Sequence, residues 1–176
     1  GIKNIVASSG TALTVDQIRL LKRYTHNVCL VYDPDTAGQM ATLRSLDLFV
    51  DEDVQVKVVS LPEGLDPDLY VRKHGADKFK ELVKTAENLF DYKFRILKKK
   101  FNAQESEGKT KICHEMFSTI NRFTDDILKS EYIKKLALGL LLDEAVLWKE
   151  INKMNKNKTV VGHQKLENVK IDPINP

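Results

Sequence analysis

Asp33 and Asp35 are the side chains whose type and spacing best suit chemistry in this sequence. They lie in the segment YDPDTAG (32–38), directly after an apolar run. In an extended backbone, side chains two residues apart point the same way. Carboxylates that close repel each other unless a proton or a cation lies between them, and hard oxygen ligands favour Mg²⁺ or Mn²⁺. The spacing predicts a divalent-ion site. The alternative is that Asp35 only caps the following helix.

A second acidic pair, Asp66 and Asp68, flanks Pro67 after another strand-like run. If both strands end at one edge of a sheet, these carboxylates lie on the same rim as the first pair. Four carboxylates on one rim would suit more than one divalent ion. The alternative is that Asp66 caps a helix and Asp68 merely favours the helix dipole.

Two further segments could meet phosphate groups. The turn SSGT (8–11) includes Ser8 and Gly10, and its amides and hydroxyls follow the first predicted strand. Arg72 and Lys73 close the short helix predicted after the second acidic pair. Both signals are weak, because a serine-glycine turn is an ordinary strand exit and basic residues suit a helix C-terminus.

The elements that must position these residues alternate between strand and helix over 1–75. Strands are predicted at 2–7, 28–32 and 54–58, and helices at about 15–24 and 36–49. Thr14 and Gln17 have the spacing of a capping box. The run VCLVY (28–32) predicts a strand buried on both faces, and the alternating VQVKV (54–58) predicts one nearer the sheet edge. The order predicts an α/β fold with a mostly parallel, Rossmann-like sheet, whose carboxyl edge is where ligands bind.

After Pro62 the pattern changes. Asp66 and Pro67 should open a short helix that Gly75 closes, and from about 76 everything reads as helix. Apolar residues three and four apart predict the buried faces of an all-α helical bundle, namely Phe90, Phe94, Leu97, Phe101, Ile112, Met116, Ile120, Phe123, Ile127, Ile133, Leu136, Leu140, Val146, Trp148 and Ile151. Beyond Met154 this periodicity is lost. The predicted domains are 1–75 (α/β), 76–155 (helical) and 156–176 (linker or tail).

Composition excludes some classes of protein and leaves others open. The 176 residues are 42% hydrophobic and 30% charged, as in ordinary globular proteins, and the net charge of +3 is too small to argue for a nucleic-acid partner. Cys29 and Cys113 lie far apart without a CxxC partner. This argues against a disulfide framework or a zinc site and favours a reducing cytoplasm. No apolar run reaches the ~18–20 residues that span a bilayer, so no membrane is expected.

Four segments together resemble the Toprim domain of bacterial DnaG-type primases. They are IVASSGTALT (5–14), YDPDTAGQMAT (32–42), LPEGLDPD (61–68) and VRKHG (71–75). Type II topoisomerases share this domain but usually continue the acidic motif differently from Ala37 and Gly38. The likeness is dense over 1–75 and looser over 76–155, where it implies a helical subdomain of the primase RNA polymerase core.

This resemblance implies a DNA-directed RNA polymerase, a nucleotidyltransferase that makes short RNA primers on single-stranded DNA at replication forks. Asp33 and Asp35 match the acidic pair that holds Mg²⁺ or Mn²⁺, and Asp66 and Asp68 match further acidic positions. The implied partners are the DNA template, ribonucleoside triphosphates and the RNA primer. A replicative helicase would bind through a C-terminal domain outside this chain, and zinc would belong to another absent domain. The implied location is the bacterial cytoplasm, at the nucleoid and replisome as part of the primosome.

The sequence departs from this family in two ways. Pro34 stands where the family usually has glycine, and the family's catalytic glutamate would precede residue 1. Neither Glu52 nor Glu63 replaces it, since both follow the acidic motif. Because the chain opens almost at once into a strand-like run, it reads as a fragment, which we expect to bind metal weakly and to make no primers.

Two other functions fit parts of the pattern. A haloacid-dehalogenase-like phosphatase also has Asp-x-Asp after a buried strand, but Ala37 stands where that family expects Thr or Val, and Ser8 and Ser9 precede the motif rather than follow it. A non-catalytic scaffold would use the helices to dock a partner and the aspartates only as caps.

Overall fold

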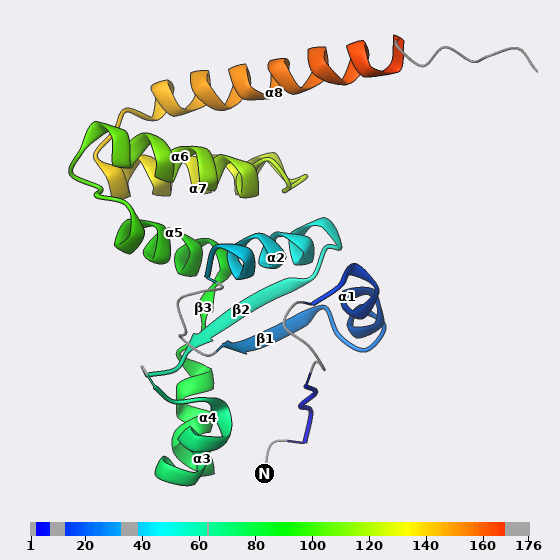
Figure 1. Ribbon diagram of the computed structural model, residues 1–176, viewed down its shortest axis with the longest axis vertical. Coiled ribbons are helices and arrows are strands. Elements are labelled where there is room, and N and C mark those ends of the chain that lie inside the picture. The colour runs from blue at the N-terminus through cyan, green and yellow to red at the C-terminus, as the bar shows by residue number, and fades with distance from the viewer. Residues whose placement is uncertain (1–2, 8–12, 33–38, 63, 168–176) are drawn as a thin grey trace, which may run out of the picture. The chain divides into compact units, whose positions relative to one another are not determined.

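A three-stranded sheet in the order β1-β2-β3 organises the first part of the chain (Figure 1). Strand β1 (Asn27–Tyr32) runs parallel to β2 (Gln55–Ser60), and β3 (Glu87–Asn88) pairs antiparallel to β2. The computed structural model describes residues 3–7, 13–32, 39–62 and 64–167. The chain separates into two compact units, Gly1–Asp126 and Ile127–Pro176. The family-domain limits predicted at 75 and 155 stay predictions.

Helices make up most of the rest. Helices α2 and α5 both contact β2 and lie on one face of the sheet (Figure 1). The helices in the first unit are α1 (Val15–Lys22), α2 (Gln39–Asp51), α3 (Pro67–His74), α4 (Ala76–Lys84), α5 (Leu89–Lys100) and α6 (Ser106–Ile120). The second unit holds α7, which begins at Asp126 (Asp126–Leu140), and α8 (Glu144–Glu167). None of the described helices is long and apolar enough to cross a membrane.

Local sequence signals set two helix starts as predicted. The Thr14 hydroxyl accepts from the Gln17 amide at 3.3 Å, and the Thr14 amide donates to the Gln17 side chain at 3.0 Å, which completes a capping box at α1. Helix α3 has Asp66 as its N-cap, Pro67 in its first turn and Gly75 at its end, with a positive φ of 85° at Gly75 that favours glycine. These predictions are confirmed.

The strands predicted at 28–32 and 54–58 are present as β1 and β2, but the first predicted strand and the burial of β1 are wrong. Residues 3–7 form no strand, and Ile5 and Val6 are 61% and 75% exposed, because they pair with no strand among the described residues. β1 is not buried on both faces. Its Cys29 is exposed, whereas Val28 and Leu30, whose side chains point to the opposite face, are half-buried.

Strand β2, predicted near the sheet edge, is instead the central strand. Its alternation arises because α2 and α5 cover one face, where Val56 and Val58 are 6% and 1% exposed. The two-residue strand β3 contradicts the prediction that everything after 76 is helical. A segment that short has no periodicity to detect.

Most of the buried positions predicted in the helices are confirmed. Ile127, Val146 and the start of the predicted tail are the exceptions. Ile133, Leu136 and Ile151 are at most 3% exposed, whereas Ile127 and Val146, predicted in the core, are 79% and 59% exposed. Next to Val146, Leu147 takes the buried position at 3% exposure. The predicted tail begins as helix, because α8 continues to Glu167. Residues 156–167 include three lysines, which are good helix formers and need no apolar stripe.

Candidate functional site

The carboxyl ends of β1 and β2 lie side by side. Their parallel register sets Tyr32 opposite Ser60, so both strands finish at the same level. We call these two strand ends the sheet edge. Asp33 follows Tyr32 directly in the sequence, but Ser8, Gly10, Asp33 and Asp35 all lie outside the described residues. The structure therefore confirms the edge on which the metal-site prediction rests, while the site residues themselves stay predictions.

Asp66 and Asp68 lie at the start of α3, a short loop after β2. The Asp66 carboxylate accepts a hydrogen bond from the Leu69 amide at 2.7 Å, which is the capping role left open above. Asp68 forms an ion pair with Arg72 at 3.0 Å, with both side chains more than half exposed. Each carboxylate thus has a structural partner. The cap uses Oδ1 of Asp66 and leaves Oδ2 out of this hydrogen bond.

The capping role of Asp66 gives a test of stability. Asp66→Ala should lower the free energy of unfolding by about 1 kcal/mol, because the Leu69 amide loses its acceptor. Asp66→Asn should change it little, since Asn caps as well as Asp does. Chemical denaturation of the three proteins measures both differences. Equal stability of the Ala variant and the parent would show that the cap contributes nothing.

Arg72 and Lys73 end α3 and are exposed. Arg72 is held by Asp68 in the same helix, which supports the simple helix-terminus explanation of its charge. Among the residues that the structure describes, no group of three or more His, Cys, Asp and Glu side chains could hold a metal ion. The metal site predicted at Asp33 and Asp35 stays a prediction.

Arg95 of α5 lies at the sheet edge, where sequence reasoning did not place it. Its Nη2 donates to Oγ of Ser60 at 2.7 Å, and its Nε lies 3.0 Å from both carboxylate oxygens of Glu87 in β3. Glu87 thereby holds one side of the guanidinium, and the other side faces the end of β2. The only sequence signal was the basic run at the end of α5, because the contact with Ser60 spans 35 residues.

A buried polar network fixes α2, the helix that follows the acidic motif. Lys93 of α5 is fully buried, and its Nζ donates to both oxygens of Asp47 at 2.9 and 3.1 Å and to Thr119 of α6 at 2.6 Å. Thr119 in turn donates to Asp47 at 2.7 Å. We call Asp47, Lys93 and Thr119 the buried network. It ties α2 to α5 and α6, so these three helices share one buried junction.

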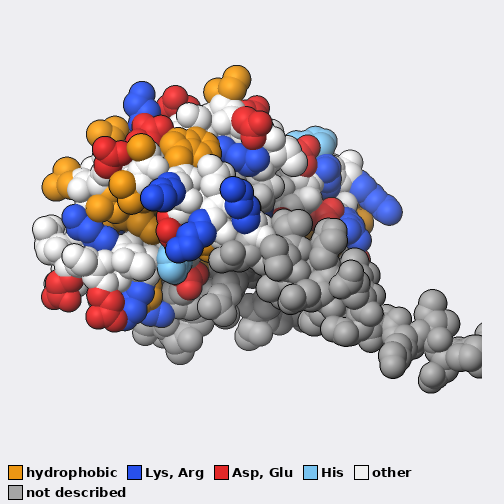
Figure 2. Space-filling model, turned by 90° about the horizontal axis from the view of Figure 1, so that it is seen from above, with side chains coloured by type: hydrophobic (Ala, Val, Ile, Leu, Met, Phe, Trp, Pro, Cys, Tyr) orange, Lys and Arg blue, Asp and Glu red, His pale blue; other side chains and the backbone are white. Residues whose placement is uncertain are grey.

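Cys113 is not suited to nucleophilic chemistry. Burial raises the pKa of the Cys113 thiol to about 11, so it stays protonated near neutral pH and is a poor nucleophile. Both cysteines are free. On the face drawn in Figure 2, acidic and basic side chains are interspersed.

Family models match both parts of the chain. A Toprim-like model matches residues 1–71, and a model described as the DnaB-helicase binding domain of primase matches residues 90–140. The helicase-binding match thus lies inside the chain, although we expected that contact in a domain outside it.

Individual proteins agree with these models. A DNA primase of Clostridium acetobutylicum is 39% identical over 89% of this chain, and one of Halalkalibacterium halodurans is 32% identical over 94%. The chain spans only 28% and 29% of their lengths. The E. coli primase catalytic core is 29% identical with a TM-score of 0.65, covering 76% of this chain and 44% of that one.

A further solved structure, a DnaG primase catalytic domain bound to single-stranded DNA, is 28% identical with a TM-score of 0.66. The similarity covers 77% of this chain and 44% of the solved primase chain. Sequence and structural likeness therefore agree along most of the chain. The chain belongs to the bacterial DnaG-type DNA primases, as a segment with part of the Toprim domain and the helices that follow it.

Proposed function

We propose that this chain supplies part of the catalytic core of a primase, which makes short RNA primers on single-stranded DNA by metal-dependent nucleotidyl transfer. The observation that carries the proposal is the Toprim-like match over 1–71 on a sheet whose parallel strands end together at Tyr32 and Ser60. Because the chain spans 28% of the Clostridium primase, primer synthesis belongs to the whole protein rather than to this segment.

The residues proposed to hold Mg²⁺ or Mn²⁺ are Asp33 and Asp35, with Asp66 and Asp68 as further ligands. All four offer carboxylate oxygens, the donors that these ions prefer. A divalent ion bound there would stabilise negative charge on the reacting phosphate and favour ionisation of the primer 3′-hydroxyl. The chain's own part would be to hold two carboxylates together at the end of β1, and the buried network fixes α2, the helix that follows them in the sequence.

Phosphate groups of the incoming ribonucleotide are the proposed ligands of Ser8, Gly10, Arg72 and Lys73. Backbone amides in a glycine turn and the exposed cations of α3 suit an anion. Zinc is proposed only for a separate domain of the whole protein.

A replicative helicase and single-stranded DNA are the proposed macromolecular partners. The helicase proposal rests on the match over residues 90–140, which covers α6, α7 and all of α5 except its first residue. The DNA proposal rests on the likeness to a primase domain solved with single-stranded DNA. Cytoplasmic location at the nucleoid and replisome follows from this role and is proposed with it.

The test is primer synthesis by the primase that contains this chain, with single-stranded templates, radiolabelled ribonucleotides and Mg²⁺ or Mn²⁺. We expect template-dependent RNA products that EDTA abolishes. A folded protein that stays inactive with every template and metal would overturn the assignment. A trapped aspartyl phosphate would instead favour the phosphatase, which the family matches do not support.

A further inference from the structure

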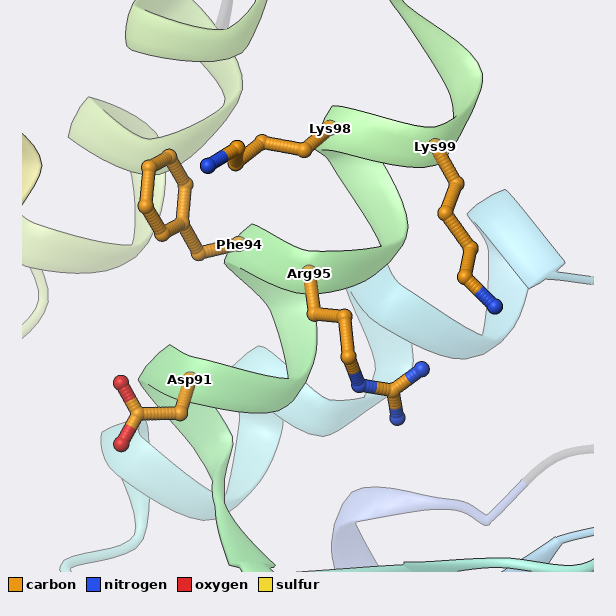
Figure 3. A pocket seen from close by; sticks show the side chains of 5 residues that line it. All are labelled: Asp91, Phe94, Arg95, Lys98 and Lys99. Atoms are coloured by element: carbon orange, nitrogen blue, oxygen red, sulfur yellow. The ribbon is translucent and has the colours of Figure 1, made fainter. Parts of the chain in front are cut away.

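Helix α5 buries one side in the core and carries several basic residues on the opposite side. Phe90, Lys93 and Leu97 are fully buried, and on the outer side an open cavity of about 330 Å³ is lined by Asp91, Phe94, Arg95, Lys98 and Lys99 (Figure 3). We call this cavity the α5 hollow. Three of its five lining side chains are cationic.

The acidic member of the hollow is already engaged. Asp91 accepts from the Asn88 side-chain amide at 2.7 Å, and its own amide donates to the Asn88 oxygen at 2.9 Å, which caps the start of α5. The cations lie one to two turns further along the helix. Lys98 and Lys99 suit the helix C-terminus, but that preference does not explain why they share a hollow with Arg95.

The hollow also contains an aromatic ring and adjoins the sheet edge. Lys98 Nζ lies 5.2 Å from the centre of the half-buried Phe94 ring. Arg95, another lining residue, donates to Ser60 at the end of β2. In Figure 3, Arg95 and Lys99 extend to one flank of α5 and Phe94 and Lys98 to the other. Arg95 therefore links the sheet edge to the flank of α5 that carries Lys99, and Lys98 lies with Phe94 on the other flank.

We propose that the α5 hollow binds the phosphate backbone of a nucleic-acid strand beside the sheet edge, with Lys98 and Lys99 contacting phosphates and Phe94 offering a ring to a base. Clustered cations next to an aromatic ring are the combination that single strands use, because every nucleotide has both a phosphate and a flat base. The proposal deepens the proposed function and rests on it. The strand could be the DNA template or the RNA product, which share the same phosphate chemistry.

The test compares Lys98→Gln/Lys99→Gln with the control Lys78→Gln/Lys84→Gln, which removes two exposed lysines from α4. Fluorescence anisotropy measures binding of the full chain to a labelled DNA single strand and to an RNA–DNA hybrid, at several salt concentrations. Losing two single-strand phosphate contacts should lower the slope of log affinity against log salt by about 1.4, which is about 25-fold in affinity near 0.1 M salt. The difference should vanish toward 1 M salt, with circular dichroism unchanged.

If Lys98→Gln/Lys99→Gln loses affinity for the DNA single strand alone, the hollow binds the template. If it loses affinity for the RNA–DNA hybrid alone, the hollow binds the product. An equal loss in the α4 control, or no loss in the α5 variant, would overturn the proposal. Asp33→Asn, assayed in parallel, separates this outcome from failure of the primase assignment. In the primase that contains this chain it should lower primer synthesis about 10³-fold, and in the chain it should leave the salt slope of binding unchanged.

Discussion

Asp33→Asn and Asp35→Asn should each lower primer synthesis about 10³-fold, the scale of losing a group that stabilises charge in a transition state. Asparagine keeps the size of the side chain but removes the negative charge that would attract a divalent ion. The thermal unfolding temperature should stay within a few degrees, since the change removes no packing. Incorporation of labelled ribonucleotides on a single-stranded template measures the loss, in the primase that contains this chain.

The matched control is Asp53→Asn, which removes one carboxylate from a turn away from the sheet edge. Asp53 is 95% exposed and has a positive φ of 53°, a conformation that Asn also adopts readily. Its substitution should leave both stability and synthesis unchanged. If Asp33→Asn and Asp53→Asn had the same small effect, the acidic motif would have no part in catalysis.

Lys93→Met should destabilise the protein by about 3–5 kcal/mol, the usual result when one member of a buried ion pair is removed. Methionine fills nearly the same volume, but Asp47, 1% exposed, would lose the ammonium that donates to both its oxygens. The Thr119 hydroxyl and Arg122, whose Nε is 3.8 Å from Asp47, would remain near it. Urea denaturation measures the difference in the free energy of unfolding.

An exposed pair of the same chemistry serves as the control. Lys80 lies 2.8 Å from Asp77, and their side chains are 45% and 93% exposed. Lys80→Met should therefore cost less than about 1 kcal/mol. The double variant Asp47→Leu/Lys93→Met should recover much of the loss, because no buried charge is left unpaired. If Lys93→Met and Lys80→Met lowered the free energy of unfolding equally, burial would not make the Asp47–Lys93 pair more stabilising than an exposed pair.

Local and periodic signals predicted much of the fold. The capping box at Thr14, the cap at Asp66 and the end at Gly75 are encoded within a few neighbouring residues, so the sequence alone was enough. The parallel β1–β2 pair followed from the alternation of strands and helices. Errors arose where burial depends on distant partners. The segment VCLVY (28–32) is apolar enough for a central strand. Its exposure, however, depends on which distant elements pack against it, and its own residues do not determine that.

Long-range polar contacts could not be predicted. Lys93 lies between Phe90 and Leu97 on the buried side of α5, which was a faint sign of an internal charge, but Asp47 is 46 residues away. Arg95 reaches Ser60 across 35 residues in the same way. The acidic motif is visible in the sequence because only one residue separates Asp33 from Asp35. A pairing of residues that the fold alone brings together leaves no such pattern.

The most direct measurement is a titration of the chain with Mn²⁺, followed by electron paramagnetic resonance of the free ion. The account predicts saturable binding by the parent chain, loss of that binding in Asp33→Asn/Asp35→Asn, and retention in Asp53→Asn. Identical Mn²⁺ binding by all three proteins, each with an unchanged circular dichroism spectrum, would contradict a metal site at the end of β1.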